Sequence, residues 1–181
     1  MAYFTKAMLE ENIYEAKRYE EMLVAKTLSD AESFHVFLSH SYKDKKYIRK
    51  LKEYIENNFS MKCYVDWITE PKALDRNNVN RHTAELLRKR MRQSQSLIFC
   101  TSDNSPDSKW MPWELGYFDA HKGRIAILPI VDEGKAFQGQ EYLGLYPYID
   151  KTDTSIWIND GQGGFVGLKD WISGTNPYKR S

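Results

Sequence analysis

Apolar side chains follow two different periods along this chain, and segments of the two kinds alternate. Runs rich in β-branched and aromatic residues predict strands. Apolar residues at helical spacing among charged ones predict helices between those strands. The predicted strands are 34–38, 62–67, 96–100 and 124–131, and the predicted helices between them are 47–58, 79–93 and 111–122.

This alternation predicts an α/β domain with right-handed crossovers between its strands. The runs at 96–100 and 124–131 are almost continuously apolar, which is typical of parallel strands that are covered on both faces. Weaker patterns predict edge strands at 146–149 and 155–158 and a closing helix at 165–173. We therefore expect a doubly wound, mainly parallel sheet of about five strands with helices on both faces.

The segment before the first strand has a helical pattern of its own. Residues 5–28 contain neither Gly nor Pro, and their apolar side chains recur at mostly helical spacing among many charges, which predicts a long amphipathic helix. We expect an N-terminal helical extension over 1–32 and a single α/β domain over 33–181. Packing on its own domain is the more frequent use of such a helix, and holding an assembly of chains together is the alternative.

A polar loop follows each predicted strand at its carboxyl end. The loops read SHSYKD, ITEPKALDRNN, TSDNSPDSKW and DEGKAF. Ligands of doubly wound sheets bind outside the carboxyl ends of the strands, so the chemistry of this chain is predicted at that edge. No G-x-G-x-x-G follows the first strand, and a bound dinucleotide redox cofactor is therefore not expected.

The composition of the chain indicates which partners and which cellular compartment to expect. The 26 Lys and Arg residues nearly balance the 25 Asp and Glu residues, for a net charge of +1, so no overall field favours nucleic acid or an anionic membrane. No apolar run approaches the roughly 18 residues that span a bilayer, and the N-terminal residues are too acidic for a signal peptide. We expect a cytoplasmic protein with neither a nucleic-acid nor a membrane partner.

Several reactive-looking residues have a plain structural explanation. Cys63 and Cys100 lie in apolar strand-like runs without a CxxC motif, and we interpret them as reduced core residues with no metal role. The basic run at 86–92 and Glu85 fit a solvated, salt-bridged helix face. His40 stands between two serines without a placed acid, which is a poor signature of a catalytic triad.

The acid that stands out is Glu114. The helix that contains it is predicted to begin near Met111, capped by Ser108 or Asp107, and to end at Gly123. Glu114 would then lie in the first turn, where free amides and the helix dipole favour a charged carboxylate. Trp110, four residues earlier, offers a flat wall for a planar ligand. From these residues alone, a dipole-stabilising Glu beside core tryptophans is the more frequent explanation.

The order of these segments resembles a TIR domain in its bacterial, TIR-like form. The resemblance rests on HVFLSHSYKD, CYVDW, SLIFCTS, SKWMPWELGY and IAILPIV, which occur in this order over residues 34–131. In that family a W-x-x-x-E motif lies on the helix after the third strand, and here the motif falls on Trp110 and Glu114. The resemblance implies the flavodoxin-like TIR fold and a catalytic role for Glu114.

The resemblance also implies a reaction. Catalytic TIR domains cleave the bond between nicotinamide and ribose in NAD+, giving ADP-ribose, a cyclic isomer or a conjugate. We expect an NAD+ nucleosidase or ADP-ribosyl cyclase that consumes NAD+ as substrate and uses no cofactor and no metal. The substrate-binding residues that the family positions imply are Ser39, His40, Ser41, Asp66, Trp67, Arg76 and Trp110. A solvated loop charge is the equally frequent explanation for Arg76.

Standalone bacterial TIR proteins of this kind, the antiphage (Thoeris-like) type, make a nucleotide signal for a separate effector, and TIR domains often associate with one another. The resemblance therefore implies self-association through TIR–TIR contacts and a role in antiphage defence. The alternatives are a non-catalytic TIR–TIR interaction module and a nucleoside deoxyribosyltransferase-like enzyme. The sequence leaves the product and the activating trigger open.

Overall fold

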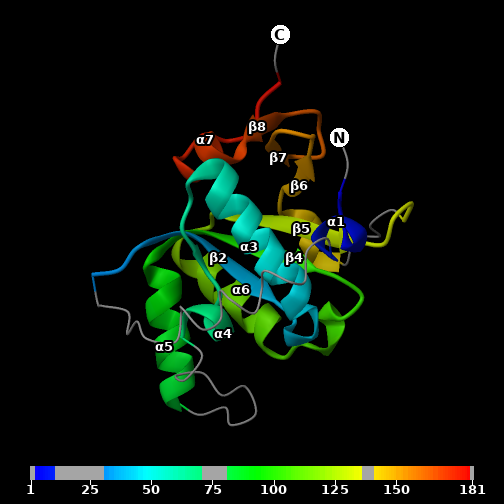
Figure 1. The fold of residues 1–181 in the computed structure, drawn as a ribbon. Coiled ribbons are helices and arrows are strands. Elements are labelled where there is room, and N and C mark those ends of the chain that lie inside the picture. Colours follow the sequence, from blue (N-terminus) through cyan, green and yellow to red (C-terminus); the bar gives the residue numbers. More distant parts are fainter. Residues whose placement is uncertain (1–2, 11–30, 71–80, 136–140, 180–181) are drawn as a thin grey trace.

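The structure, a computed structural model, describes residues 3–10, 31–70, 81–135 and 141–179. In these residues eight strands form one sheet, in the order β3-β2-β4-β5-β6-β7-β8, with β1 paired to β5 (Figure 1). The strands are β1 (Phe4–Thr5), β2 (Phe34–His40), β3 (Cys63–Tyr64), β4 (Ser94–Thr101), β5 (Ile125–Val131), β6 (Tyr148–Lys151), β7 (Ile156–Asn159) and β8 (Phe165–Gly167). The α-helices are α1 (Lys6–Glu10), α3 (Lys45–Phe59), α4 (Asp66–Thr69), α5 (Arg81–Arg92), α6 (Trp110–His121) and α7 (Leu168–Ile172), and the short 3-10 helices are η1 (Tyr42–Asp44), η2 (Ser105–Asp107) and η3 (Glu141–Leu145).

The sheet has a parallel part, made of β3, β2, β4, β5 and β6. In chain order these strands stand second, first, third, fourth and fifth, which is the flavodoxin-like order. The direction of winding therefore reverses between β2 and β4, and the carboxyl ends of these two strands form the switch point where such folds bind ligands. The predicted doubly wound, mainly parallel sheet is confirmed. It is wider than expected because antiparallel β7 and β8 extend it and β1 adds to β5.

Helices cover both faces of the sheet. One core lies under α1, α3 and α7, and the other lies under α5 and α6; in Figure 1, α3 crosses in front of the sheet. Within β2, Val36 and Leu38 belong to the first core and Phe37 to the second, because successive side chains of a strand point to opposite faces. The same alternation decides which way the residues at the end of β2 point.

Three elements differ from the sequence-based expectation. Asp66 and Trp67 belong to α4 rather than to a strand, because the amides of Ile68 and Thr69 bond the carbonyl of Val65 and close a helical turn. β6 is an interior strand between β5 and β7, and β8 forms the edge. The segment expected as a closing helix begins as the strand β8 and continues as α7.

The N-terminal residues pack on the sheet. Phe4 and Thr5 pair with Ile130 and Val131 of β5, and Phe4 and Leu9 are buried in the core under α3. The expected long helix is seen only as α1, and residues 11–28 of that prediction lie outside the described residues. In the described part of the chain, no helix combines the length and hydropathy needed to cross a bilayer.

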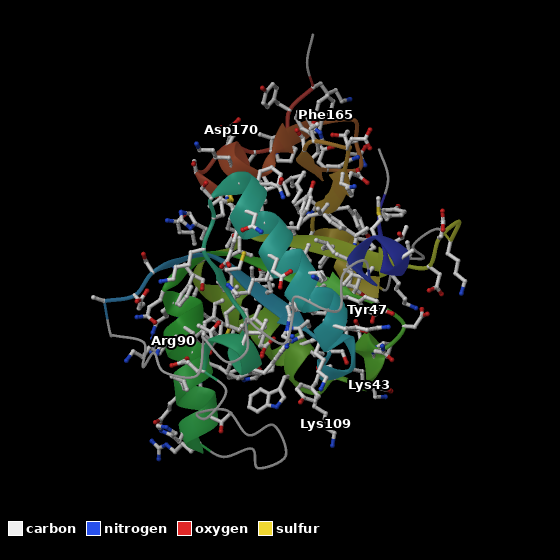
Figure 2. All side chains as sticks on the ribbon, viewed as in Figure 1. Lys43, Tyr47, Arg90, Lys109, Phe165 and Asp170 are labelled. Carbon is white, nitrogen blue, oxygen red and sulfur yellow. The ribbon has the colours of Figure 1, made fainter. Side chains whose placement is uncertain are left out.

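The basic run at 86–92 is not entirely a solvated face, as the sequence suggested. Arg90, labelled in Figure 2, is buried on α5 and donates to both carboxylate oxygens of Glu70, at 2.8 Å from Nε and 2.5 Å from Nη2. Tyr64 also donates its hydroxyl to Glu70, at 3.0 Å. Glu85, in contrast, forms the expected exposed pair with Arg81. The buried pair joins the residue that follows α4 to α5, across 20 positions of sequence.

Both cysteines are free and buried, as the sequence predicted. Cys63 lies in β3 and Cys100 in β4, and burial raises the pKa of each thiol. The thiolate is the reactive form of cysteine, so neither side chain is available for redox chemistry in the folded protein.

Replacing Glu70 with Ala leaves the buried guanidinium of Arg90 without its carboxylate. We expect the free energy of unfolding in urea to fall by about 3 kcal/mol, since breaking a buried pair strands a charge. Glu85→Ala is the matched control, because it removes a carboxylate from an exposed helical pair and should change stability by about 0.5 kcal/mol or less. Equal losses of unfolding free energy in the two variants would contradict the assignment of Glu70 and Arg90 as a buried ion pair.

The thiols should be protected only while the chain is folded. We expect neither Cys63 nor Cys100 to react with iodoacetamide in native buffer, because burial keeps them neutral and out of reach. Both should alkylate once guanidinium chloride has unfolded the protein. Intact mass measured over the time of exposure counts the modified sites, and rapid native alkylation would show that β3 or β4 opens.

Candidate functional site

Glu114 occupies a position of α6 that the fold reserves for apolar side chains. The residues that α6 buries follow the spacing i, i+3, i+4, i+7, and they are Met111, Glu114, Leu115 and Phe118. The residue Glu114 is only 2% exposed. A carboxyl group at such a position costs stability unless its oxygens are bonded, so its presence calls for a partner and suggests a function.

The partner is Ser39, at the end of β2. Its hydroxyl donates to Oε2 of Glu114 across 2.6 Å, and the two residues are 75 positions apart in the sequence. Ser39 points to the α6 side of the sheet because it follows Phe37 by two residues, and Phe37 lies in the core under α5 and α6. The hydrogen bond therefore forms at the switch point between β2 and β4.

The position of Glu114 in its helix differs from the prediction. α6 begins at Trp110, after Lys109, so Glu114 is the fifth residue of the helix and lies beyond its first turn. Ser108 does contribute at the start, since its Oγ accepts from the amide of Met111 at 3.4 Å. We expected the free amides at the start of the helix to stabilise Glu114. In the structure Glu114 is buried beyond the first turn, and the hydroxyl of Ser39 bonds its carboxyl group instead.

The end of α6 matches the prediction. Gly123 has a φ of 62°, in the left-handed region that favours glycine. Its amide donates to the carbonyl of Phe118 at 3.3 Å, as in a helix stop of this type.

His40 forms a second polar pair, on the other side of β2. Nε1–H of Trp67 donates to Nε2 of His40 at 2.9 Å, and Nδ1 of His40 lies 2.9 Å from the carbonyl oxygen of Leu38. An indole N–H can only donate and a carbonyl can only accept, so His40 is the neutral tautomer with its proton on Nδ1. Its Nε2 is engaged with Trp67, which makes His40 a holder of Trp67 rather than a general base.

The structure divides the predicted site residues between two clusters. Ser39 lies with Glu114, whereas His40 lies with Trp67, and Asp66 Oδ1 is 3.9 Å from His40 Nε2. Adjacent strand residues point to opposite faces, so Ser39 and His40 do not line the same side of β2, although both were predicted to bind the substrate.

The remaining predicted residues lie around these two clusters. Ser41 is buried just beyond β2. Trp110 is half-buried one helical turn before Glu114 and contacts Trp113 edge to face, with ring centroids 5.2 Å apart. Arg76 and most of the loop ITEPKALDRNN lie outside the described residues.

Sequence reasoning missed a third buried polar cluster at this edge. Asp44, 1% exposed, accepts a hydrogen bond from Oγ of Ser102 at 2.5 Å and another from Nδ2 of Asn104 at 2.6 Å. The available signal was the acid that ends the SHSYKD loop, opposite the polar loop TSDN. Neither loop shows by itself that its side chains meet those of the other.

A pocket elsewhere in the fold adds nothing to these clusters, and the described residues form no metal site. A pocket of about 300 Å³ lies between α1 and α3, lined in part by Phe4, Tyr54 and Lys151, and it shares no residue with the Glu114 site. Among the described residues, no three His, Cys, Asp or Glu side chains gather as metal ligands.

Comparison with known proteins places this geometry in a family. The model of the TIR domain family matches residues 36–160. The "Probable 3' cyclic ADP-D-ribose synthase ThsB'" of Bacillus cereus (strain MSX-D12) is 47% identical over 147 residues, which cover 77% of this chain and 75% of that protein. The "Putative cyclic ADP-D-ribose synthase TIR2" of Cytobacillus dafuensis is 39% identical over 84 residues, covering 46% of this chain and 22% of that protein.

Among solved structures, the TIR domain of the Toll-related receptor TRR-2 from Hydra magnipapillata superposes with a TM-score of 0.48 at 16% identity, covering 67% of this chain and 86% of that one. The family match and the Bacillus cereus relative each extend over more than two thirds of the chain. On these two sequence matches, the chain belongs to the TIR domain family.

Proposed function

We propose that this chain cleaves NAD+ at the bond between nicotinamide and ribose and closes the remaining ADP-ribose into a cyclic isomer. The observation that carries the proposal is the buried carboxyl group of Glu114, bonded to Ser39 at the switch point of the sheet. A relative that is 47% identical is named as a 3' cyclic ADP-D-ribose synthase, which supports the choice of substrate and product.

Glu114 has the chemistry that this cleavage needs. The bond between C1 of the ribose and the nicotinamide nitrogen breaks, and nicotinamide leaves with the bonding electron pair. Positive charge then develops on C1 and the ring oxygen of the ribose, as in glycoside cleavage. A carboxylate beside that carbon stabilises the charge, and it does so more strongly where water is excluded.

Ser39 gives Glu114 a fixed orientation. Its hydroxyl bonds Oε2, and a carboxylate held before the reaction needs little reorganisation as charge develops. We assign Glu114 as the catalytic residue and Ser39 as the residue that positions it at the substrate.

The second half of the reaction is a competition for the cationic carbon. If a hydroxyl oxygen of the adenosine ribose attacks C1 and loses its proton, the product is a cyclic ADP-ribose. If water attacks, the product is linear ADP-ribose. A buried site disfavours water, which is why we favour the cyclic product.

The other residues surround the substrate in this proposal. Trp110 provides a wall beside Glu114, Ser41 and Asp66 line the strand ends, Trp67 is held by His40, and Arg76 binds the diphosphate through its forked guanidinium donors. NAD+ is consumed as substrate, and no cofactor or metal takes part.

The biological setting is part of the same proposal. We infer that the protein acts in the cytoplasm in antiphage defence, self-associates through TIR–TIR contacts, and supplies a nucleotide signal to a separate effector. Neither nucleic acid nor a membrane is a partner in this scheme.

Glu114→Gln tests the catalytic assignment. The amide preserves the shape and can still accept from Ser39, but it carries no charge, so we expect nicotinamide release from NAD+ to fall by about a thousandfold or more. Glu85→Gln, an exposed acid on α5, is the matched control and should keep full activity. Mass spectrometry separates the two products, since the linear one is heavier by one water.

Two outcomes would point to the alternatives. Failure of the wild-type protein to consume NAD+ even when crowded, with self-association intact, would indicate an interaction module. Transfer of deoxyribose between bases would indicate the deoxyribosyltransferase-like enzyme.

Ser39→Ala tests the positioning hydroxyl. Losing a hydrogen bond to a charged group is worth about 1.5 to 3 kcal/mol, so we expect kcat to fall by about tenfold to a hundredfold. Ser96→Ala is the control, because Ser96 is also buried in a parallel strand and donates to a carbonyl, that of His35, at the opposite edge of the sheet. Similar kinetic losses in both variants would indicate general damage to the sheet.

A further inference from the structure

Asp44 connects the two strand ends between which the Glu114 site lies. It ends η1, just after β2, and its carboxylate bonds Ser102 and Asn104 in the loop that follows β4. The partners are 58 and 60 positions away in the sequence. One buried carboxylate therefore spans the switch point from the β2 side to the β4 side.

Both ends of this connection are fixed further by backbone hydrogen bonds. On the β2 side, the amide of Asp44 donates to the carbonyl of Ser41 at 2.9 Å. On the β4 side, the amide of Asn104 donates to Oγ of Ser102 at 3.0 Å, and the amide of Ser102 donates to Oγ of Ser105 at 2.8 Å. Ser105 begins η2, which leads into α6.

We propose that Asp44 is a positioning residue that sets the placement of Glu114 relative to Ser39 by tying the end of β2 to the loop that starts α6. The kinetic part of this inference rests on the proposed function. Asp44 does not bond Glu114 or Ser39 itself in the described contacts; it acts through the two loops. A buried network whose members are all bonded is rigid, and rigid support of this kind holds a reactive group in its productive geometry.

The same two loops are also joined at the surface. Lys43, labelled at the lower right in Figure 2, contacts Asp107 at 2.5 Å, and the two side chains are 61% and 63% exposed. An exposed ion pair contributes little because water and salt screen it. The surface pair is therefore the natural control for the buried connection.

Hydrogen-bond chemistry provides a variant that breaks the connection and another that keeps it. Asp44→Ala removes both acceptor oxygens, so neither Ser102 nor Asn104 keeps a partner at position 44. In the reciprocal pair Asp44→Asn/Asn104→Asp, the new amide oxygen accepts from Ser102 and the new NH2 group donates to the new carboxylate. This pair thus keeps both hydrogen bonds with the charge moved to the other loop.

The experiment measures nicotinamide release by the wild type, Asp44→Ala, the reciprocal double variant and Asp107→Asn. We expect Asp44→Ala to lower kcat by about tenfold to a hundredfold, as misplacement of a catalytic group does, with KM within about twofold. The double variant should keep most of the wild-type kcat, and Asp107→Asn should match the wild type. An unchanged kcat in Asp44→Ala, or a folded double variant whose kcat falls as far, overturns the inference.

A second measurement does not depend on the reaction. Hydrogen exchange should accelerate in Asp44→Ala in the peptides that contain 36–44 and 101–112, stay at the wild-type rate in 125–131, and remain near the wild-type rate throughout in the double variant. Ser102→Ala, which removes one of the two bonds, should show the same pattern more weakly and replaces Asp44→Ala if that variant does not fold. If the wild type releases no nicotinamide, the proposed function fails while the exchange pattern still supports the connection; unchanged exchange in both segments overturns it.

Discussion

A carboxyl group buried on the apolar face of a helix is stable only where another group of the protein bonds its oxygens. Glu114 meets this condition through the hydroxyl of Ser39, which reaches it from the neighbouring strand β2. Met111, Leu115 and Phe118 share the buried face of α6 with Glu114. These neighbours exclude water from the acid, and its requirement for a fixed partner follows from this burial.

The strand order explains why that partner comes from β2. The winding of the sheet reverses between β2 and β4, so the chain leaves these adjacent strands toward opposite faces. The carboxyl end of β2 is then followed by η1, and that of β4 by the loop and η2 that lead to α6. Ser39 and His40 occupy the end of β2 and point to different faces, which separates the acid of α6 from the His40–Trp67 pair.

Buried polar side chains gather at the carboxyl ends of the parallel strands, and each of those that the structure describes forms a hydrogen bond. Ser39, His40, Asp44 and Glu114 all lie within or just beyond the carboxyl ends of β2 and β4 or on the helix that follows. No buried side-chain nitrogen or oxygen of the described residues lacks a hydrogen-bond partner. At the opposite edge, Ser96 simply satisfies a backbone carbonyl. A core built for stability alone would place apolar residues where these groups stand. Ligands of doubly wound sheets bind at this edge, so the bonded polar groups there support the proposed position of the site.

The local pattern of apolar and polar residues was sufficient to predict the strands and helices whose buried faces are regular. The apolar runs of β2, β4 and β5 and the helical spacing of α3 predict those segments closely, because periodicity reports which side of an element faces the core. The start and stop signals around α6 predict that helix. The family motif likewise pointed to Trp110 and Glu114 before any coordinates. The strand predicted over 62–67 is present only as the two residues of β3. The pairing of β1 with β5 was not predictable, since a two-residue strand such as β1 has no period to detect.

Hydrogen-bond partners were decided only by the tertiary structure. The sequence showed an acid at position 114, another at position 44 and an arginine at position 90, each explicable as an ordinary surface or helix-end charge. Their burial and their partners Ser39, Ser102 and Glu70 depend on which strands are neighbours and on which face each side chain meets. Contacts across 20 to 75 positions of sequence arise from the order of strands in the sheet, and local periodicity carries no information about that order.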